Sequence, residues 1–234
     1  YRGQQYRGSA GGGGAGMGPR GRRRRRGALS GWAGVVALLL FAGVSLPAAG
    51  AAAPGTCHAL IVAGLPGTPV HARRLSDWAR RFHAWLTAKA GVPAANVALL
   101  GAGGPAAGAP PPPTAEAVLA ELRRLAGAAR PEDQFVLVWL GHGSTTDGVP
   151  KLLLGGPDLS AAELAGALAG LRAGNQVLLL LGSASGDALP AVVGAQRVVI
   201  AATSPLEVVE PVFAEFLLRG LESVPAARRE ARKF

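Results

Sequence analysis

The segment Phe135-Val-Leu-Val-Trp-Leu-Gly-His-Gly143 decides the fold. Its first six residues are all apolar and rich in β-branched and aromatic side chains, which predicts a strand buried on both faces, as in the middle of a parallel sheet. This strand leads directly into Gly141-His142-Gly143. Open α/β sheets bind their ligands at the carboxyl ends of parallel strands, and flanking glycines let another group approach an imidazole. His142 is therefore the first candidate functional residue; the alternative is a solvated histidine in an ordinary turn.

Strands and helices alternate on both sides of this segment. Apolar runs predict further strands at 58–63, 96–100, 176–181 and 197–202, and periodic apolar residues predict helices at 73–90, 115–129, 160–171 and 207–221. Asp147-Gly148, which precedes Lys151 to Leu154, is typical of a β-hairpin. Thr114 and Ser160-Ala-Ala-Glu163 predict helix N-caps. We expect an α/β domain over residues 54–234, a three-layer αβα sandwich with a mostly parallel sheet of about five strands.

The first 53 residues differ in composition from the rest. Residues 1–27 are rich in glycine and arginine and are expected to be disordered. Residues 28–53 follow the basic run Arg22 to Arg26 and combine an apolar stretch with small residues, which is the pattern of an export signal. The apolar stretch is close to the ~20 residues that span a bilayer, so it is either a signal peptide or a membrane anchor. Both interpretations predict a domain outside the cytoplasm, secreted, periplasmic or anchored to the membrane through this segment.

The net charge of +10 does not indicate a nucleic-acid partner, because it is concentrated at the start of the chain. Residues 1–53 hold eight arginines and no acidic residue. The remaining residues carry 16 basic and 14 acidic side chains, so the predicted domain is nearly neutral. A surface that binds phosphates needs clustered positive charge, and we therefore expect no nucleic acid to bind.

The sequence indicates neither a metal centre nor a cofactor. Cys57 is the only cysteine, which excludes an intramolecular disulfide and a thiolate cluster. The four histidines show no ligand spacing with one another: His58, His71, His83 and His142. The stretch 101–106 formally fits a dinucleotide motif, but such a motif must open a helix, and Pro110 to Pro113 follow it instead.

A second buried strand ends in small residues with hydroxyl groups. The predicted strand 176–181 is followed by Gly182-Ser183-Ala184-Ser185-Gly186. Only one predicted helix separates it from the strand that ends at His142, so the two strands are expected to be neighbours. His142 and Ser183 should then lie side by side at one edge of the sheet.

With these two strand ends the sequence resembles the caspase and legumain-like cysteine peptidases. In that family a buried strand ends in His-Gly, an Asp-Gly hairpin and a helix follow, and a second buried strand ends in Cys-x-Ser-Gly. The resemblance extends from residue 57 to about residue 220 and implies a caspase-like fold. It also implies that His142 is the general base, that the Gly143 N–H helps to hold an oxyanion, and that Ser183 occupies the position of the nucleophilic cysteine.

The serine in place of cysteine determines the expected function. A thiol has a pKa of about 8.5, which falls further beside a cationic histidine, so a cysteine and a histidine suffice for nucleophilic catalysis. A serine hydroxyl normally needs a base that a third group holds. Asp147, Asp158 and Asp187 are candidates for this group, but nothing in the sequence directs them to His142. We therefore expect an inactive peptidase homologue that binds a peptide or protein ligand.

Three other interpretations remain open. The first is an active hydrolase that uses Ser183 with His142. The second is an anion site at the same edge, because the segment after Ser183 is expected to lead into a helix, whose free N–H groups favour a negative ligand. The third is an α/β protein that is unrelated to these peptidases.

Overall fold

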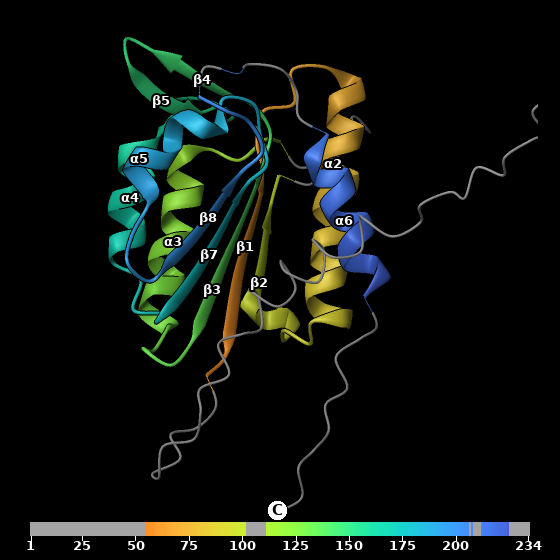
Figure 1. The fold of residues 1–234 in the computed structure, drawn as a ribbon, viewed down its shortest axis with the longest axis vertical. Helices are drawn as coiled ribbons and strands as arrows, with labels where there is room; N and C mark the ends of the chain where they lie inside the picture. The colour runs from red at the N-terminus through yellow and green to blue at the C-terminus, as the bar shows by residue number, and fades with distance from the viewer. Residues whose placement is uncertain (1–54, 102–110, 206, 208–211, 225–234) are drawn as a thin grey trace, which may run out of the picture.

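A five-stranded parallel sheet lies at the centre of the computed structural model, which describes residues 55–101, 111–205, 207 and 212–224 (Figure 1). The strands lie in the order β2-β1-β3-β7-β8. Their bounds are Val97–Leu100 for β2, Cys57–Ala63 for β1, Gln134–Leu140 for β3, Asn175–Leu180 for β7 and Arg197–Ala201 for β8. The prediction of a mostly parallel sheet of about five strands is confirmed, and β3, the strand that leads to His142, is its central strand.

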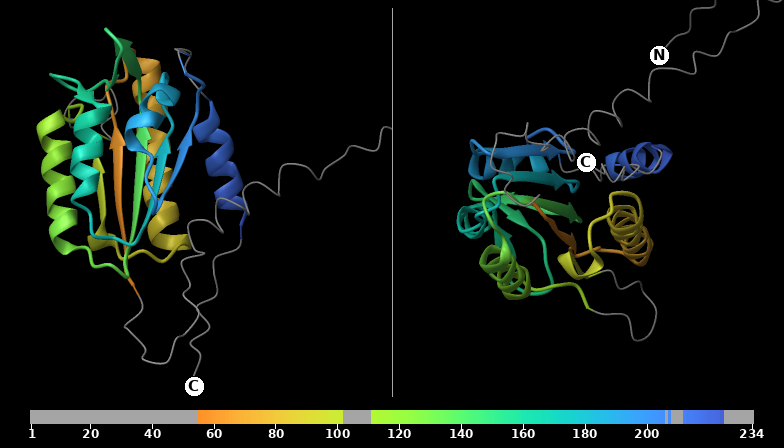
Figure 2. Two further views of the ribbon diagram at one scale, coloured as in Figure 1. Left: turned by 60° about the vertical axis from the view of Figure 1, so that its left-hand side comes forward. Right: turned by 90° about the horizontal axis from the view of Figure 1, so that it is seen from below.

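The register of the central strands brings their carboxyl ends to one level. β1 pairs with β3 over seven residues, from Cys57 opposite Gln134 to Ala63 opposite Leu140. β3 pairs with β7 up to Trp139 opposite Leu180. Residues Phe135 to Leu140 are all buried, because helices cover both faces of the sheet (Figure 2). The expected adjacency of the two buried strands is therefore also confirmed.

Helices form the two outer layers. On one face lie α2 (Pro69–Ala84), which continues as a π-helical turn (Trp85–Lys89), and α6 (Phe213–Ser223). On the other face lie α3 (Ala115–Ala128), α4 (Ala161–Ala169) and the short α5 (Leu189–Val192). Alternate residues of β3 point into the two cores: Val138 and Leu140 into the first, Leu137 and Trp139 into the second. This is the three-layer arrangement that the sequence predicted.

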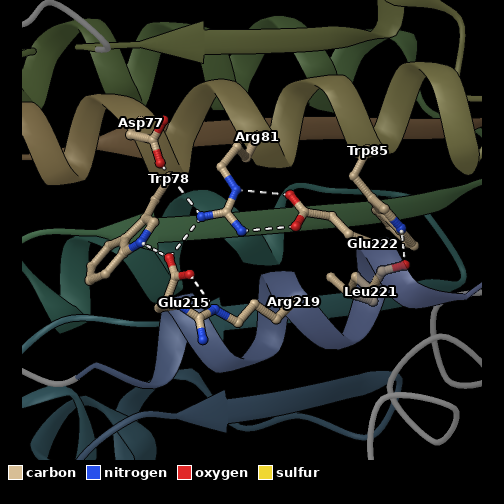
Figure 3. A network of polar contacts seen from close by, with 8 residues as sticks. All are labelled: Asp77, Trp78, Arg81, Trp85, Glu215, Arg219, Leu221 and Glu222. Atoms are coloured by element: carbon tan, nitrogen blue, oxygen red, sulfur yellow. Dashed lines mark hydrogen bonds and ion pairs between the residues drawn. The ribbon is translucent and has the colours of Figure 1, made fainter. Parts of the chain in front are cut away.

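A polar network joins α2 to α6 at the surface (Figure 3). Arg81 of α2 donates to Glu215 at 2.7 Å and, through two nitrogens, to both carboxylate oxygens of Glu222 at 2.8 Å. Two tryptophans and a further arginine complete the network: Trp78 Nε1 and Arg219 Nε donate to Glu215, and Trp85 Nε1 donates to the Leu221 carbonyl. These hydrogen bonds from Trp78, Arg219 and Arg81 lower the pKa of Glu215 to about 2.

A small antiparallel sheet follows β3, with the order β4-β5-β6. Its strands are β4 (Gly143–Thr146), β5 (Val149–Leu152) and β6 (Leu159–Ser160). Asp147 and Gly148 both have positive φ, 52° and 73°, which is the conformation of a tight hairpin turn and explains the Asp-Gly pair. The predicted hairpin is confirmed, although its second arm begins at Val149 rather than Lys151, and β6 was not predicted.

The helix N-caps lie where the sequence predicted them, whereas two helices begin at other residues than predicted. Thr114 Oγ1 accepts from the Ala117 N–H, and Ser160 and Glu163 form the predicted capping box. The helix expected from residue 73 begins at Pro69, because Thr68 caps it and proline suits a first helical position. The helix expected from residue 207 begins at Phe213. A proline at position 211 would interrupt a helix interior.

The expectations for residues 1–53, which concern disorder and an export signal or anchor, fall outside the described residues, as does most of the glycine-rich stretch 101–106. Among the helices in the described ranges, none has both the length and the apolar character needed to cross a bilayer.

Candidate functional site

His142 and Ser183 meet at the carboxyl edge of the sheet. Ser183 Oγ lies 3.4 Å from His142 Nδ1. The register explains this contact: Trp139 of β3 is opposite Leu180 of β7, and each functional residue follows three positions later on its own chain segment. The two strands therefore deliver an imidazole and a hydroxyl at equal height. Ser183 is only 3% exposed, whereas His142 is partly exposed.

Glycines allow the two strand ends to pack this closely. A Cβ atom at Gly182 would lie 2.4 Å from the Gly141 carbonyl oxygen, and one at Gly143 would lie 2.6 Å from the Ser183 carbonyl oxygen. Gly141 has a φ of 141°, a conformation that other residues rarely adopt. Small residues on both sides of the site are thus required by contacts between backbones, independently of any chemistry.

The Gly143 N–H, which the resemblance assigns to oxyanion binding, donates to Ser183 Oγ at 3.2 Å. The hydroxyl oxygen therefore accepts from the backbone on one side and faces the imidazole on the other. In this arrangement the N–H is directed at the serine oxygen.

The far nitrogen of His142 faces a backbone carbonyl. Nε2 lies 3.3 Å from the Pro66 oxygen, so a proton on Nε2 would be donated to Pro66, which leaves Nδ1 free to accept from the Ser183 hydroxyl. The three candidate aspartates serve elsewhere: Asp147 forms the hairpin turn, Asp158 accepts from the Leu154 N–H, and Asp187 accepts from Thr145 Oγ1. Within the described ranges, no carboxylate contacts His142.

Pro66 is a member of the site that the sequence did not indicate. It lies in the loop after β1, and its oxygen also accepts from the Thr68 N–H at 2.8 Å. The neighbouring Leu65 N–H donates to the Leu153 carbonyl, and the Leu153 N–H donates to the His142 carbonyl. The side-chain pattern cannot indicate which backbone carbonyl accepts a hydrogen bond. The available signal for this loop was that β1 lies beside β3 and ends in a glycine-bounded loop at the same edge.

The segment after Ser183 is fixed to the end of β8. The Ser185 N–H donates to Thr203 Oγ1 at 2.9 Å, and Ser185 Oγ accepts from the N–H groups of Ala202 and Thr203 at 3.0 and 3.2 Å. Ala184 takes a left-handed conformation with φ 50°, which costs a non-glycine residue about 1–2 kcal/mol. These contacts hold the turn in its strained shape and so set the position of the Ser183 hydroxyl.

The expected helix after Ser183 is much shorter than an anion site requires. The segment forms a 3-10 turn (Ser185–Ala188) and then the four-residue α5. Pro190 lies in the first turn of α5 and has no N–H to offer. The N–H groups of Ser185 and Gly186, at the start of this segment, already point at Thr203 Oγ1, so fewer free donors face the edge than the anion-binding interpretation assumed.

The described residues contain no group of three or more histidine, cysteine or acidic side chains that could hold a metal ion. Cys57 is the first residue of β1 and lies at the amino end of the strands, whereas His142 lies at their carboxyl end. Burial, assisted by the charge of Asp133, raises the pKa of its thiol to about 11, so it is not a nucleophile at neutral pH.

Comparison with models of known protein families and with curated proteins found no match for this chain.

Proposed function

We propose that residues 54–234 form an exported domain of the caspase and legumain-like type, whose peptidase centre is degenerate and serves to bind a peptide or protein ligand. The observation that carries this proposal is the contact of Ser183 Oγ with both His142 Nδ1 and the Gly143 N–H. This contact supports the proposal because it brings together the histidine, the backbone donor and the residue in the nucleophile position that the resemblance implies.

The order of elements supports the proposal. His142 follows the end of β3 by two residues, the β4–β5 hairpin and α4 come next, and Ser183 follows the end of β7 by three residues. This is the succession of the family described above, with the hairpin turn at Asp147 and Gly148. Two short motifs alone would be weak support, but here they lie on adjacent parallel strands at the edge where such sheets place their ligands.

Two features of the site argue against efficient catalysis by Ser183. His142 is backed by the neutral carbonyl of Pro66, which stabilises an imidazolium less than a carboxylate does. Ser183 is buried, and the Gly143 N–H is already directed at its oxygen. A thiol would tolerate the weaker base because its proton is far more acidic, whereas a hydroxyl does not have this advantage.

An active serine hydrolase is the second candidate, favoured by one observation. The 3.4 Å separation of Ser183 Oγ and His142 Nδ1 is within the range that catalytic pairs show before substrate binds and draws them closer. In this alternative His142 takes the hydroxyl proton, Ser183 attacks an acyl group, and the Gly143 N–H turns to the resulting oxyanion.

One experiment separates the two candidates. The purified protein is incubated with a fluorophosphonate and, separately, with a panel of peptides, and the products are analysed by mass spectrometry. The proposal predicts an unmodified Ser183 and peptides that are retained by the protein but recovered uncut. Labelling of Ser183 that disappears in His142→Ala would instead establish the hydrolase. Absence of both labelling and peptide retention would reject both candidates.

A further inference from the structure

The first turn of α2 brings a second imidazole against the site. The ring centroids of His71 and His142 are 5.7 Å apart, with an angle of 49° between the planes. This separation is within the range in which aromatic rings pack favourably. His71 is partly buried, and nothing in the spacing of the two histidines along the chain predicts that their rings meet.

The hydrogen bonds of His142 leave its ring orientation weakly determined. Its two contacts, to Ser183 Oγ and the Pro66 oxygen, are long at 3.4 and 3.3 Å. Such bonds are near the limit at which the interaction is still effective. A half-turn about the Cβ–Cγ bond of His142 would exchange Nδ1 with Cδ2 and put a carbon atom opposite the hydroxyl. The ring contact with His71 is a further interaction available to favour one orientation.

His71 and Pro66 approach His142 from one continuous, well-fixed segment. Thr68 caps α2 by accepting from the His71 N–H at 3.2 Å, and the Thr68 N–H donates to the Pro66 oxygen at 2.8 Å. Between them, Gly67 has a φ of +72°, and a Cβ there would lie 3.7 Å from His142 Nε2. The loop thus passes directly over the far nitrogen before His71 reaches the ring.

We propose that His71 is a positioning residue for His142. Its ring and the Pro66 carbonyl act together to keep the proton on Nε2 and to direct Nδ1 at Ser183. This role goes beyond the proposed function, because it concerns the orientation of an imidazole and holds whether or not Ser183 acts as a nucleophile.

The test is the tautomer ratio of His142 in the full chain labelled with ¹⁵N-histidine, measured by NMR in alkaline buffer and assigned with His142→Gln. His71→Ala should lower the ratio of the Nε2–H to the Nδ1–H form by about twofold or more, because the ring contact acts on the ratio only through the part of its energy that differs between the two forms. His71→Phe, which keeps a ring, should restore the ratio toward its original value. His83→Ala, a change of another partly buried histidine on α2, should leave it unaltered.

Two results would overturn the proposal: an unchanged ratio in His71→Ala, or a ratio in His71→Phe that equals that of the alanine variant. If His71→Ala does not fold, His71→Leu takes its place as the variant without a ring. A lower ratio in His71→Leu than in His71→Phe supports the proposal, and equal ratios reject it.

Discussion

Replacing Glu215 with glutamine is expected to weaken the contact between α2 and α6 in a pH-dependent way. Glu215 accepts hydrogen bonds from Trp78, Arg81 and Arg219 at 2.9, 2.7 and 2.6 Å. These bonds lower its pKa from the ordinary value of 4.5 to about 2. A shift of this size corresponds to about 3 kcal/mol before solvent screening is taken into account. Because the side chain is 26% exposed, solvent screening reduces the expected loss in Glu215→Gln to about 1–2 kcal/mol.

The sign of the pH dependence follows from the direction of the shift. A carboxylate whose pKa is lowered by folding stabilises the protein fully above its unfolded pKa, here 4.5, and loses this contribution as the pH falls through about 2. The difference in unfolding free energy between the original protein and Glu215→Gln should therefore be constant from about pH 7 to about pH 5. By about pH 3 less than half of it should remain.

Urea unfolding followed by tryptophan fluorescence measures this difference. Glu132→Gln is the matched control, since it removes one surface ion pair with Arg130 and should cost no more than about 0.5 kcal/mol. A stabilising role of the Glu215 carboxylate is refuted if Glu215→Gln lowers the unfolding free energy no more than the control does at neutral pH, or if this difference does not become smaller in acid.

Three further substitutions or treatments have definite expected outcomes. Cys57 should resist iodoacetamide in the folded protein at about pH 8 and react only on unfolding, because burial holds its thiol pKa at about 11; rapid alkylation under native conditions would contradict this. Gly143→Ala should displace the Ser183 turn, since the added Cβ would lie 2.6 Å from a carbonyl oxygen; calorimetry should find a lower Tm. Gly166→Ala in α4 meets open space and should raise the unfolding free energy by about 0.5–1 kcal/mol, and a fall would refute the helix assignment.

The sheet could be predicted from the sequence because its strands are buried on both faces. Such strands consist of continuous apolar runs, and β3 and β7 are clear examples. The hairpin and the caps were predictable for a different reason: Asp147-Gly148, Thr114 and Ser160 satisfy local backbone requirements that few other residues meet.

The helix starts show where this kind of inference fails. Apolar periodicity marks the buried face of a helix but not its first turn, which in α2 is Pro69 to Ala72. The Thr68-Pro69 pair was the available signal for that start. For α6 the periodic pattern extended backward through a proline, which should have ended the prediction earlier.

Only part of the candidate site could be predicted from the sequence. His142 and Ser183 could be predicted together because strand adjacency follows from the order of elements. The other two contacts of the imidazole could not, since Pro66 contributes a backbone oxygen and His71 arrives from a helix far away in the sequence. Such contacts depend on the exact path of a loop, which side-chain patterns do not specify.

The reactivity of a Ser183→Cys variant tests most directly whether this edge is a thiol-peptidase centre with a hydroxyl in place of the thiol. Alkylation of the introduced thiol by iodoacetamide is followed at about pH 6.5, with the partly buried Cys57, whose thiol pKa is raised to about 11, as internal reference. We predict that the introduced thiol reacts at least about tenfold faster than the same thiol in the double variant Ser183→Cys/His142→Ala, because His142 stabilises the thiolate. Equal rates in the two variants would contradict the account.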